Sequence, residues 1–232
     1  MLTVKPEIQA MKRIIIALLA CLPMTGMAQN TWEVPQEDTR QTQSQQKKKA
    51  LFETHKKAED PKYLAGAVPE VDGRIIFTLD KDVPGMGADE IYQKTFDALQ
   101  ALVKEPDQFP TSKIAAVNKD EHTIAARFKE WLVFQNTFLS LDRTIFLYTL
   151  IVKATDGHLK VTMERLGYQY EKEREDTNGG LDTKAEEWIS DQVALNKKKD
   201  KLNKFCAKFR RKTIDRKDHL FDYLCKAVGV AY

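Results

Sequence analysis

The four histidines of this chain are the residues best able to act as general bases or metal ligands. His122 and His158 lie at the starts of predicted strands, but no serine or cysteine in a recognisable catalytic motif accompanies either. His219 and Asp222 are one helical turn apart, so a metal site is conceivable, yet no second histidine lies at ligand spacing. Glycine-rich phosphate loops, HExxH and GxSxG patterns are absent from the sequence. We therefore predict no catalytic residue, no metal and no cofactor. The alternative is a hydrolase or transferase that uses His122 or His158 with a nearby carboxylate.

Cys206 and Cys225 are the cysteines that remain once a leader containing Cys21 is removed. An even number of cysteines in an oxidising compartment makes them a disulfide candidate, which would close a loop of about 20 residues. The alternative is two reduced cysteines in the core, because both lie on apolar faces of predicted helical segments. The distance between them decides, and spacing in the sequence does not give it.

The densest charge feature is the basic run Lys197–Lys217, KKKDKLNKFCAKFRRKTIDRK. It could contact acidic lipid head groups or an acidic polymer, with Phe205 and Phe209 as apolar partners. We favour the interpretation that the lysines cover the solvent side of a helix whose aromatic residues face the core. Membrane contact is then expected only through this run or through a lipid on Cys21.

Aromatic residues of the central segment could line a ligand groove on an open sheet face. The candidates for ligand binding are Trp131, Phe134 and Phe146, and Phe138 lies between them in the sequence. Such a face would bind an unknown protein or a hydrophobic ligand. Packing in the core or at the sheet edge is the alternative and the more common use of these residue types.

The start of the chain predicts export. Met11-Lys12-Arg13 forms a charged start, Ile14–Leu22 an apolar core, and Gly26-Met27-Ala28 a small-residue cleavage site. The apolar core is far too short for a membrane span. We therefore expect Met11 to be the true start and the mature protein to be periplasmic or secreted. In an alternative, Leu18-Leu19-Ala20-Cys21 acts as a lipobox and produces an outer-membrane lipoprotein.

Net charge excludes one class of partner for the mature chain. The whole chain has 37 Lys and Arg against 34 Asp and Glu, and removal of the signal (Lys5, Lys12, Arg13 and Glu7) leaves 34 against 33. A nearly neutral chain has no global field that would attract nucleic acid or an anionic membrane. We expect no nucleic-acid partner.

The stretch Gly73–Val103 organises the predicted fold. Apolar residues alternate over 75–80 as in a strand with one buried face, and Val83-Pro84-Gly85 ends that strand. Apolar residues then recur at three- and four-residue steps from Ile91 onward, which predicts an amphipathic helix. Gly87 stands at the expected N-cap, so this helix lacks a capping side chain.

Four strands and a helix follow. The strands are expected at 113–117, 122–134, 144–154 and 158–166. The third is apolar on both faces and should be central. A helix is expected at 182–199, and helical extension after it, in which a final helix begins with Asp215 as its N-cap. Because the links have hairpin length, the strands should form an antiparallel sheet with both helices on one face. The prediction is a two-layer α+β fold with the order β-α-β-β-β-β-α.

The expected organisation has four parts along the chain. These are a signal peptide at 1–28, a polar leader at 29–70 with a short helix around 48–58, the α+β domain at 71–200, and a C-terminal helical extension at 201–232.

The segments IIFTLDKDVPGMGADEIY, FKEWLVF, LYTLIVKATDGHLKVTM, EEWISD, ALNKKKDKLNKF and RRKTIDRKDHLFD support these expectations. They resemble a family of exported bacterial proteins catalogued as domain of unknown function 4468 and described as having a TBP-like fold. The resemblance covers about residues 73–224, and its most specific piece is the VPGM turn before the helix. It implies the fold and export, and it brings no catalytic residues. A topology like that of the TATA-binding protein does not imply DNA binding, because function resides in sites grafted onto folds.

Together these observations favour a non-enzymatic, exported binding or interaction module. Besides the enzyme alternative, an envelope-associated structural protein anchored by Lys197–Lys217 remains open.

Overall fold

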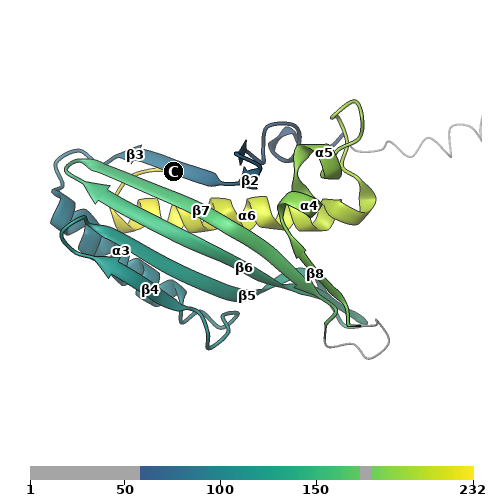
Figure 1. The fold of residues 1–232 in the computed structure, drawn as a ribbon, viewed down its shortest axis with the longest axis horizontal. Coiled ribbons are helices and arrows are strands. Elements are labelled where there is room, and N and C mark those ends of the chain that lie inside the picture. The colour runs from purple at the N-terminus through teal and green to yellow at the C-terminus, as the bar shows by residue number, and fades with distance from the viewer. Residues whose placement is uncertain (1–57, 173–178) are drawn as a thin grey trace, which may run out of the picture. The chain divides into compact units, whose positions relative to one another are not determined.

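The computed structural model describes residues 58–172 and 179–232. The predicted signal peptide and lipobox lie outside the described residues, as does nearly all of the short helix predicted around 48–58. The elements in chain order (Figure 1) are η1 (Pro61–Tyr63), β1 (Glu70–Val71), β2 (Arg74–Ile75), β3 (Phe77–Asp82), α3 (Ala88–Leu102), β4 (Lys113–Asn118), β5 (Thr123–Thr137), β6 (Ser140–Thr155), β7 (His158–Tyr170), β8 (Leu181–Lys184), α4 (Glu186–Ile189), α5 (Asp191–Ala194) and α6 (Lys204–Ala227).

The main sheet is antiparallel, as predicted, and has six strands. Its order is β3-β7-β6-β5-β4, and β8 pairs with the second half of β7. β3 pairs with the first half of β7, with Phe77 opposite Met163. The strand predicted to be central, β6, lies in the middle, which agrees with apolar residues on both of its faces.

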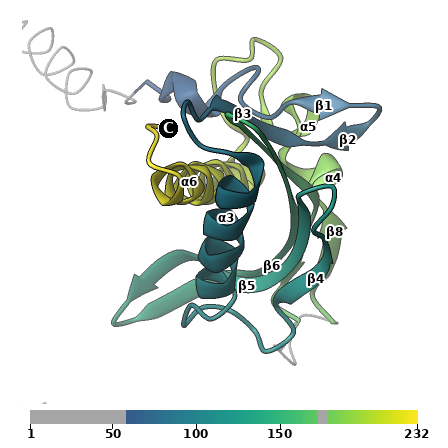
Figure 2. The ribbon, with the colours of Figure 1, turned by 90° about the vertical axis from the view of Figure 1, so that its left-hand side faces the viewer.

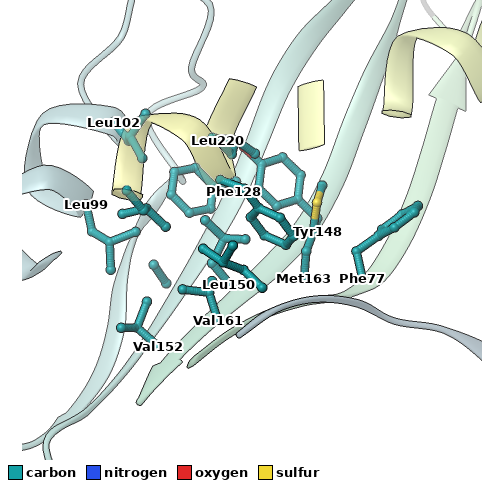
Figure 3. Close-up of a cluster of buried hydrophobic side chains, with 14 of the residues drawn as sticks. Phe77, Leu99, Leu102, Phe128, Tyr148, Leu150, Val152, Val161, Met163 and Leu220 are labelled. Carbon is teal, nitrogen blue, oxygen red and sulfur yellow. The ribbon is translucent and has the colours of Figure 1, made fainter. Parts of the chain in front are cut away.

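One face of the sheet carries the hydrophobic core, and α3 and α6 cover this face (Figure 2). Alternate side chains along β5, β6 and β7 point toward it and are buried. Leu99 of α3 and Leu220 of α6 belong to the same cluster as Phe128, Tyr148 and Leu150 of the sheet (Figure 3). Burial of each large apolar side chain contributes about 1.5–3 kcal/mol. The two-layer α+β prediction is confirmed.

The start of α3 is capped by another element. Gly87 is the N-cap, as predicted, and provides no side-chain hydrogen bond. Instead, the Asp156 carboxylate in the β6–β7 turn accepts a hydrogen bond of 2.9 Å from the Ala88 N–H. Its negative charge also interacts favourably with the positive end of the helix dipole. The hairpin thus supplies the cap that the helix sequence lacks.

The helix predicted at 182–199 is wrong. Residues 181–184 form β8, and α4 and α5 are single turns separated at Ser190, whose ψ of 158° is incompatible with a continuous helix. The second helix of the layer is α6, which runs unbroken through Asp215, where an N-cap was predicted. No glycine or proline interrupts it. Among the described helices, α6 included, none combines the length and apolar character of a membrane span.

The described residues form one unit, which includes the segments on both sides of 70/71 and of 200/201. α6 is part of the core through Leu220 and Leu224, which are fully buried. The segment before β1 is attached to the same helix: Arg211 forms hydrogen bonds of 2.6–2.9 Å to the Glu59 carboxylate. Val68 is buried in the core as well.

Arg210 of α6 is fully buried and joins three segments. Its guanidinium donates hydrogen bonds to the carbonyl oxygens of Tyr63, Leu64 and Ile189 at 2.6–2.7 Å. It also forms an ion pair with Asp191 at 2.6 Å. The chain before β1 and the α4–α5 junction are thereby fastened to one side chain.

A second buried ion pair lies between the sheet and α6. The Arg216 guanidinium donates two hydrogen bonds of 2.8 Å to the buried Glu130 carboxylate of β5, and one of 2.8 Å to Glu105. Gln108 also donates to Glu130. Burial disfavours the charge on Arg216, but the hydrogen bonds to Glu130 outweigh burial and raise the pKa of the guanidinium.

Candidate functional site

The other face of the sheet is not covered by any helix of the described chain (Figure 2). The open face required by the hypothesis of a binding module is therefore present. Apolar side chains gather on it: Trp131 of β5 lies directly opposite Ile145 of β6, and Leu147 follows two positions along β6. Trp131 and Leu147 are only half-buried. This is the apolar part of the open face.

A cavity of about 430 Å³ lies on this face beside the β5–β6 turn. Four apolar side chains line it: Trp131, Leu139, Leu141 and Ile145. Polar groups at its rim include Arg143, Gln169 and Lys172. The volume is in the range of small-molecule sites, and the lining is amphipathic, because Asp142, Glu171 and other polar side chains also contribute to it. We call it the hairpin cavity.

Arg143 is the cation of the hairpin cavity that remains available to a ligand. Its guanidinium carbon lies 3.6 Å from the centre of the Trp131 ring, a cation–π contact. Within the described residues, Arg143 forms no ion pair. Lys172, in contrast, pairs with Asp182 at 2.5 Å, and this hydrogen bond lowers the pKa of the carboxyl group.

Of the two carboxylates that line the cavity, Asp142 and Glu171, that of Asp142 is neutralised by α6. Lys208 of α6 donates to Asp142 at 2.8 Å and to the Tyr170 hydroxyl at 2.8 Å. Tyr170 itself donates to Asp142 at 2.9 Å. Burial disfavours the Lys208 charge, but these partners outweigh burial and raise its pKa. The Asp142 carboxylate is therefore compensated by a cation and repels an anionic ligand little.

The three predicted ligand-binding residues separate in the structure. Trp131 lines the hairpin cavity. Phe134 lies on the covered face, 4.6 Å from the Phe209 ring, because it continues the alternation of the buried Phe128 and Leu132, whereas Trp131 points to the other face. Phe146 is fully buried against Tyr168. The interpretation of Phe134 and Phe146 as groove residues is therefore wrong, and both belong to the core.

Sequence reasoning missed Leu139, Leu141 and Arg143. A signal was available, because β6 reads as apolar on both faces and only one face can pack against the two helices. What it could not give was the length of the hairpin. β5 and β6 pair out to Thr137 and Ser140, beyond the predicted strand ends, and this extension builds the cavity.

A larger cavity of about 890 Å³ lies between β2 and β8, and its lining includes more charged residues than that of the hairpin cavity. Its lining carries charges of both signs: Asp72, Glu164, Asp182, Glu186 and Glu187 against Arg74, Arg165 and Lys184. The Glu186 carboxylate already accepts a hydrogen bond of 2.8 Å from the Ile75 N–H. These groups partly satisfy one another, so we place the candidate site at the smaller cavity.

His122 and His158 each lie within hydrogen-bond reach of a carboxylate, as the enzyme alternative requires. His122 is 2.7 Å from Asp89, and the two ring nitrogens of His158 are 2.8 Å from Asp80 and 3.1 Å from Asp82. Neither histidine lines the two cavities above. In residues 58–172 and 179–232, no group of three His, Cys, Asp or Glu is arranged to hold a metal ion.

Of the two alternatives for Cys206 and Cys225, the structure has the reduced pair in the core and not the disulfide. Both residues lie on the unbroken helix α6, 19 positions apart, and are free and buried. At about 1.5 Å per residue their Cα atoms are about 28 Å apart, whereas a disulfide requires about 4.4–6.8 Å. Burial raises the pKa of both thiols.

Alkylation of the unfolded chain without reductant is therefore expected to label both Cys206 and Cys225, because neither is oxidised. Intact mass before and after reduction measures this, and the reduced sample serves as the control. Labelling of this pair only after reduction would contradict the geometry. In the folded protein we expect slow labelling, because a raised thiol pKa leaves little thiolate.

The basic run Lys197–Lys217 does not act as one surface. Within it, Lys208, Arg210, Arg211, Arg216 and Lys217 all form ion pairs with acidic residues. The aromatic residues also divide: Phe209 is buried, as the favoured interpretation requires, but Phe205 is 84% exposed. That interpretation is confirmed for Phe209 and is wrong for Phe205.

Comparison with known proteins gives a consistent result for the fold. The sequence profile described as "Domain of unknown function (DUF4468) with TBP-like fold" matches residues 77–169, from the start of β3 almost to the end of β7. The chain is similar to a DUF4468 family protein from Bacteroides ovatus of known crystal structure. Sequence identity is 39%, the TM-score is 0.69, and the match covers 75% of this chain and 97% of that one.

A TBP-like protein from Parabacteroides distasonis is a more distant match, with 22% identity and a TM-score of 0.54 over 71% of this chain and 99% of that one. At that identity the likeness concerns the fold alone. Among curated proteins, no match was found.

Proposed function

Because this chain belongs to the family described as domain of unknown function (DUF4468) with TBP-like fold, and a fold alone assigns no activity, we propose that it is a non-enzymatic binding module for a small amphipathic anion. The apolar body of the ligand occupies the hairpin cavity, and its acidic group contacts Arg143. The observation that carries the proposal is a cavity with an apolar wall, formed by Trp131, Leu141 and Ile145, beside a cation that has no ion-pair partner in the described chain.

The chemistry of the walls supports this ligand class. Each CH₂ group of a ligand that leaves water against Trp131, Leu141 and Ile145 contributes about 0.8 kcal/mol. The Arg143 guanidinium is planar and can donate two parallel hydrogen bonds to a carboxylate. The stacked Trp131 ring holds it in place, so little side-chain entropy is lost on binding.

We also propose that the module is exported and meets its ligand in the periplasm or outside the cell. The charged start, apolar core and cleavage pattern of Met11–Ala28 support this proposal. In protein purified from its native host, we expect an intact mass that corresponds to a chain beginning at Gln29. A lipid on Cys21 would change the proposal to a tethered module, and an uncleaved start would contradict it.

Dodecanoate is expected to bind the protein with one site, and Arg143→Gln to weaken this binding about tenfold or more, as loss of a charge-assisted hydrogen bond implies. Leu141→Asp is expected to weaken it further, because the new carboxylate repels the ligand and removes an apolar wall. Isothermal titration calorimetry below the micelle concentration measures both effects.

Lys153→Gln is the control, because it removes one cation from the far end of the same strand, where the residue is exposed. The affinity of Lys153→Gln for dodecanoate should equal that of the unmodified protein. Dodecyltrimethylammonium, which has the same chain and the opposite charge, should bind weakly. Equal binding of both amphiphiles, or unchanged affinity in Arg143→Gln and Leu141→Asp, would disprove the site.

A further inference from the structure

The turn between β5 and β6 exposes two adjacent large apolar side chains. Phe138 is 102% exposed and Leu139 is 90% exposed. Leu141, at the start of β6, is 55% exposed. A single exposed leucine is ordinary on a protein surface, but a cluster at the tip of a hairpin marks an interaction site.

A second exposed apolar residue lies in a basic setting at the start of α6. Phe205 is 84% exposed, whereas Phe209, one turn later, is buried in the core. The preceding segment carries five exposed lysines, at positions 197, 198, 199, 201 and 204. Within the described chain none of these lysines forms an ion pair, in contrast to the cations later in α6. Their charge is thus available to a partner.

These two surfaces lie at the same end of the sheet. Figure 1 shows the β5–β6 turn and the start of α6 at the right-hand end. The Lys208–Asp142 ion pair of 2.8 Å joins the second turn of α6 to the beginning of β6, close to the β5–β6 turn. We call this end, formed by residues 138–141 and 197–205, the apolar-basic end.

We propose that the apolar-basic end docks on an anionic lipid surface, with Phe138, Leu139 and Phe205 inserted among the acyl chains and the lysines of 197–204 near the lipid phosphates. Protruding apolar side chains flanked by unpaired lysines are the pattern of proteins that bind membranes at the interface. A protein partner would need two hollows matched in position to the two protrusions, whereas a lipid layer accepts protrusions of any spacing. The charge complementarity therefore selects anionic lipid.

This proposal goes beyond the hairpin cavity and does not depend on its ligand. Leu139 and Leu141 belong to both the cavity and the docking end, so a docked module would open its cavity toward the lipid. The two proposals are separable, since Arg143→Gln is expected to weaken dodecanoate binding and to leave vesicle binding unchanged.

The test is sedimentation of the full chain with sucrose-loaded vesicles of phosphatidylcholine, with and without about one-third phosphatidylglycerol. We expect binding to the anionic vesicles that falls about tenfold in Phe138→Ser/Leu139→Ser and also in Lys197→Gln/Lys198→Gln/Lys199→Gln. High salt should weaken the contribution of the lysines to vesicle binding, because screening shortens the range of electrostatic interactions. All variants keep residues 1–57, so any contribution of that segment is the same in each.

Two variants are matched controls. Val71→Ser/Val117→Ser removes two half-exposed apolar residues from other strands, and Lys113→Gln/Lys119→Gln/Lys153→Gln removes the same charge from exposed positions elsewhere. Both should bind vesicles like the unmodified protein, with unchanged circular dichroism. Absence of vesicle binding, or equal loss in the controls, would overturn the proposal. Equal binding to uncharged vesicles would do the same.

Discussion

Replacement of Arg210 by alanine is expected to lower the free energy of unfolding by about 3–5 kcal/mol, the usual cost of breaking a buried ion pair by removing one partner. The change leaves Asp191 without its cation and three backbone carbonyls without their donor. Urea denaturation of the full chain, followed by circular dichroism, measures the loss. We also expect faster proteolysis before β1, because the carbonyl oxygens of Tyr63 and Leu64 lose their hydrogen bonds to α6.

Lys212→Ala is the matched control for Arg210. It lies two positions later on the same helix, is exposed and has no ion pair within the described residues. Its effect should stay within about 0.5 kcal/mol, as for most surface substitutions. A loss of similar size in both variants would show that Arg210 acts through helix propensity and not through its contacts.

Replacement of Arg216 by methionine is expected to cost a similar amount, about 3–5 kcal/mol, because the Glu130 carboxylate stays buried without its cation. The double variant Glu130→Met/Arg216→Met should be markedly more stable than Arg216→Met alone, since it removes the charge that has no partner. A double-mutant cycle in urea measures the coupling between the two residues.

Lys226→Ala provides the comparison for Arg216. Lys226 pairs with Asp222 one turn away on the exposed surface of the same helix. Such a pair contributes about 0.3–0.5 kcal/mol. If Arg216→Met lowered the free energy of unfolding no more than Lys226→Ala does, the Arg216–Glu130 ion pair would not contribute to stability.

The sheet and the first helix could be predicted from the sequence because their patterns are local. The alternation in 75–80 and the helical spacing after Gly87 each identify an element without reference to the rest of the chain. The hairpin-length links then impose antiparallel order. The fold class follows from these local signals together with the family resemblance.

The C-terminal part could not be predicted in the same way. Residues 182–199 have apolar residues at helical spacing, but β7 offers an unpaired edge at Gly167–Tyr170, and pairing with it makes 181–184 a strand. α6 was divided in the prediction because Asp215 resembles an N-cap. In the structure the Asp215 carboxylate instead accepts a hydrogen bond of 2.8 Å from the Tyr63 hydroxyl. These outcomes depend on tertiary partners that lie far away in the sequence.

The sequence contained a weaker signal for the candidate site than for the C-terminal elements. Trp131 was identified by residue type, but Phe134 and Phe146 have the same chemistry and lie on the other face. Alternation separates them, because Phe134 and Phe146 fall in the buried series of their strands and Trp131 does not. The length of the β5–β6 hairpin, which brings Leu139 and Leu141 to the cavity, does not follow from periodicity.

The attachment of the chain's earliest described segment to its last helix has a consequence for the order of folding. β3 pairs with β7, and the carbonyl oxygens of Tyr63 and Leu64 accept hydrogen bonds from Arg210 of α6. Neither set of contacts can form until the later partner has been synthesised. During synthesis, β5, β6 and β7 can form hairpins while their apolar face still lacks α6. Contacts of such long sequence separation slow folding, since loop closure precedes any stabilising contact. The core can therefore be completed only after α6 has been synthesised and has packed against the sheet.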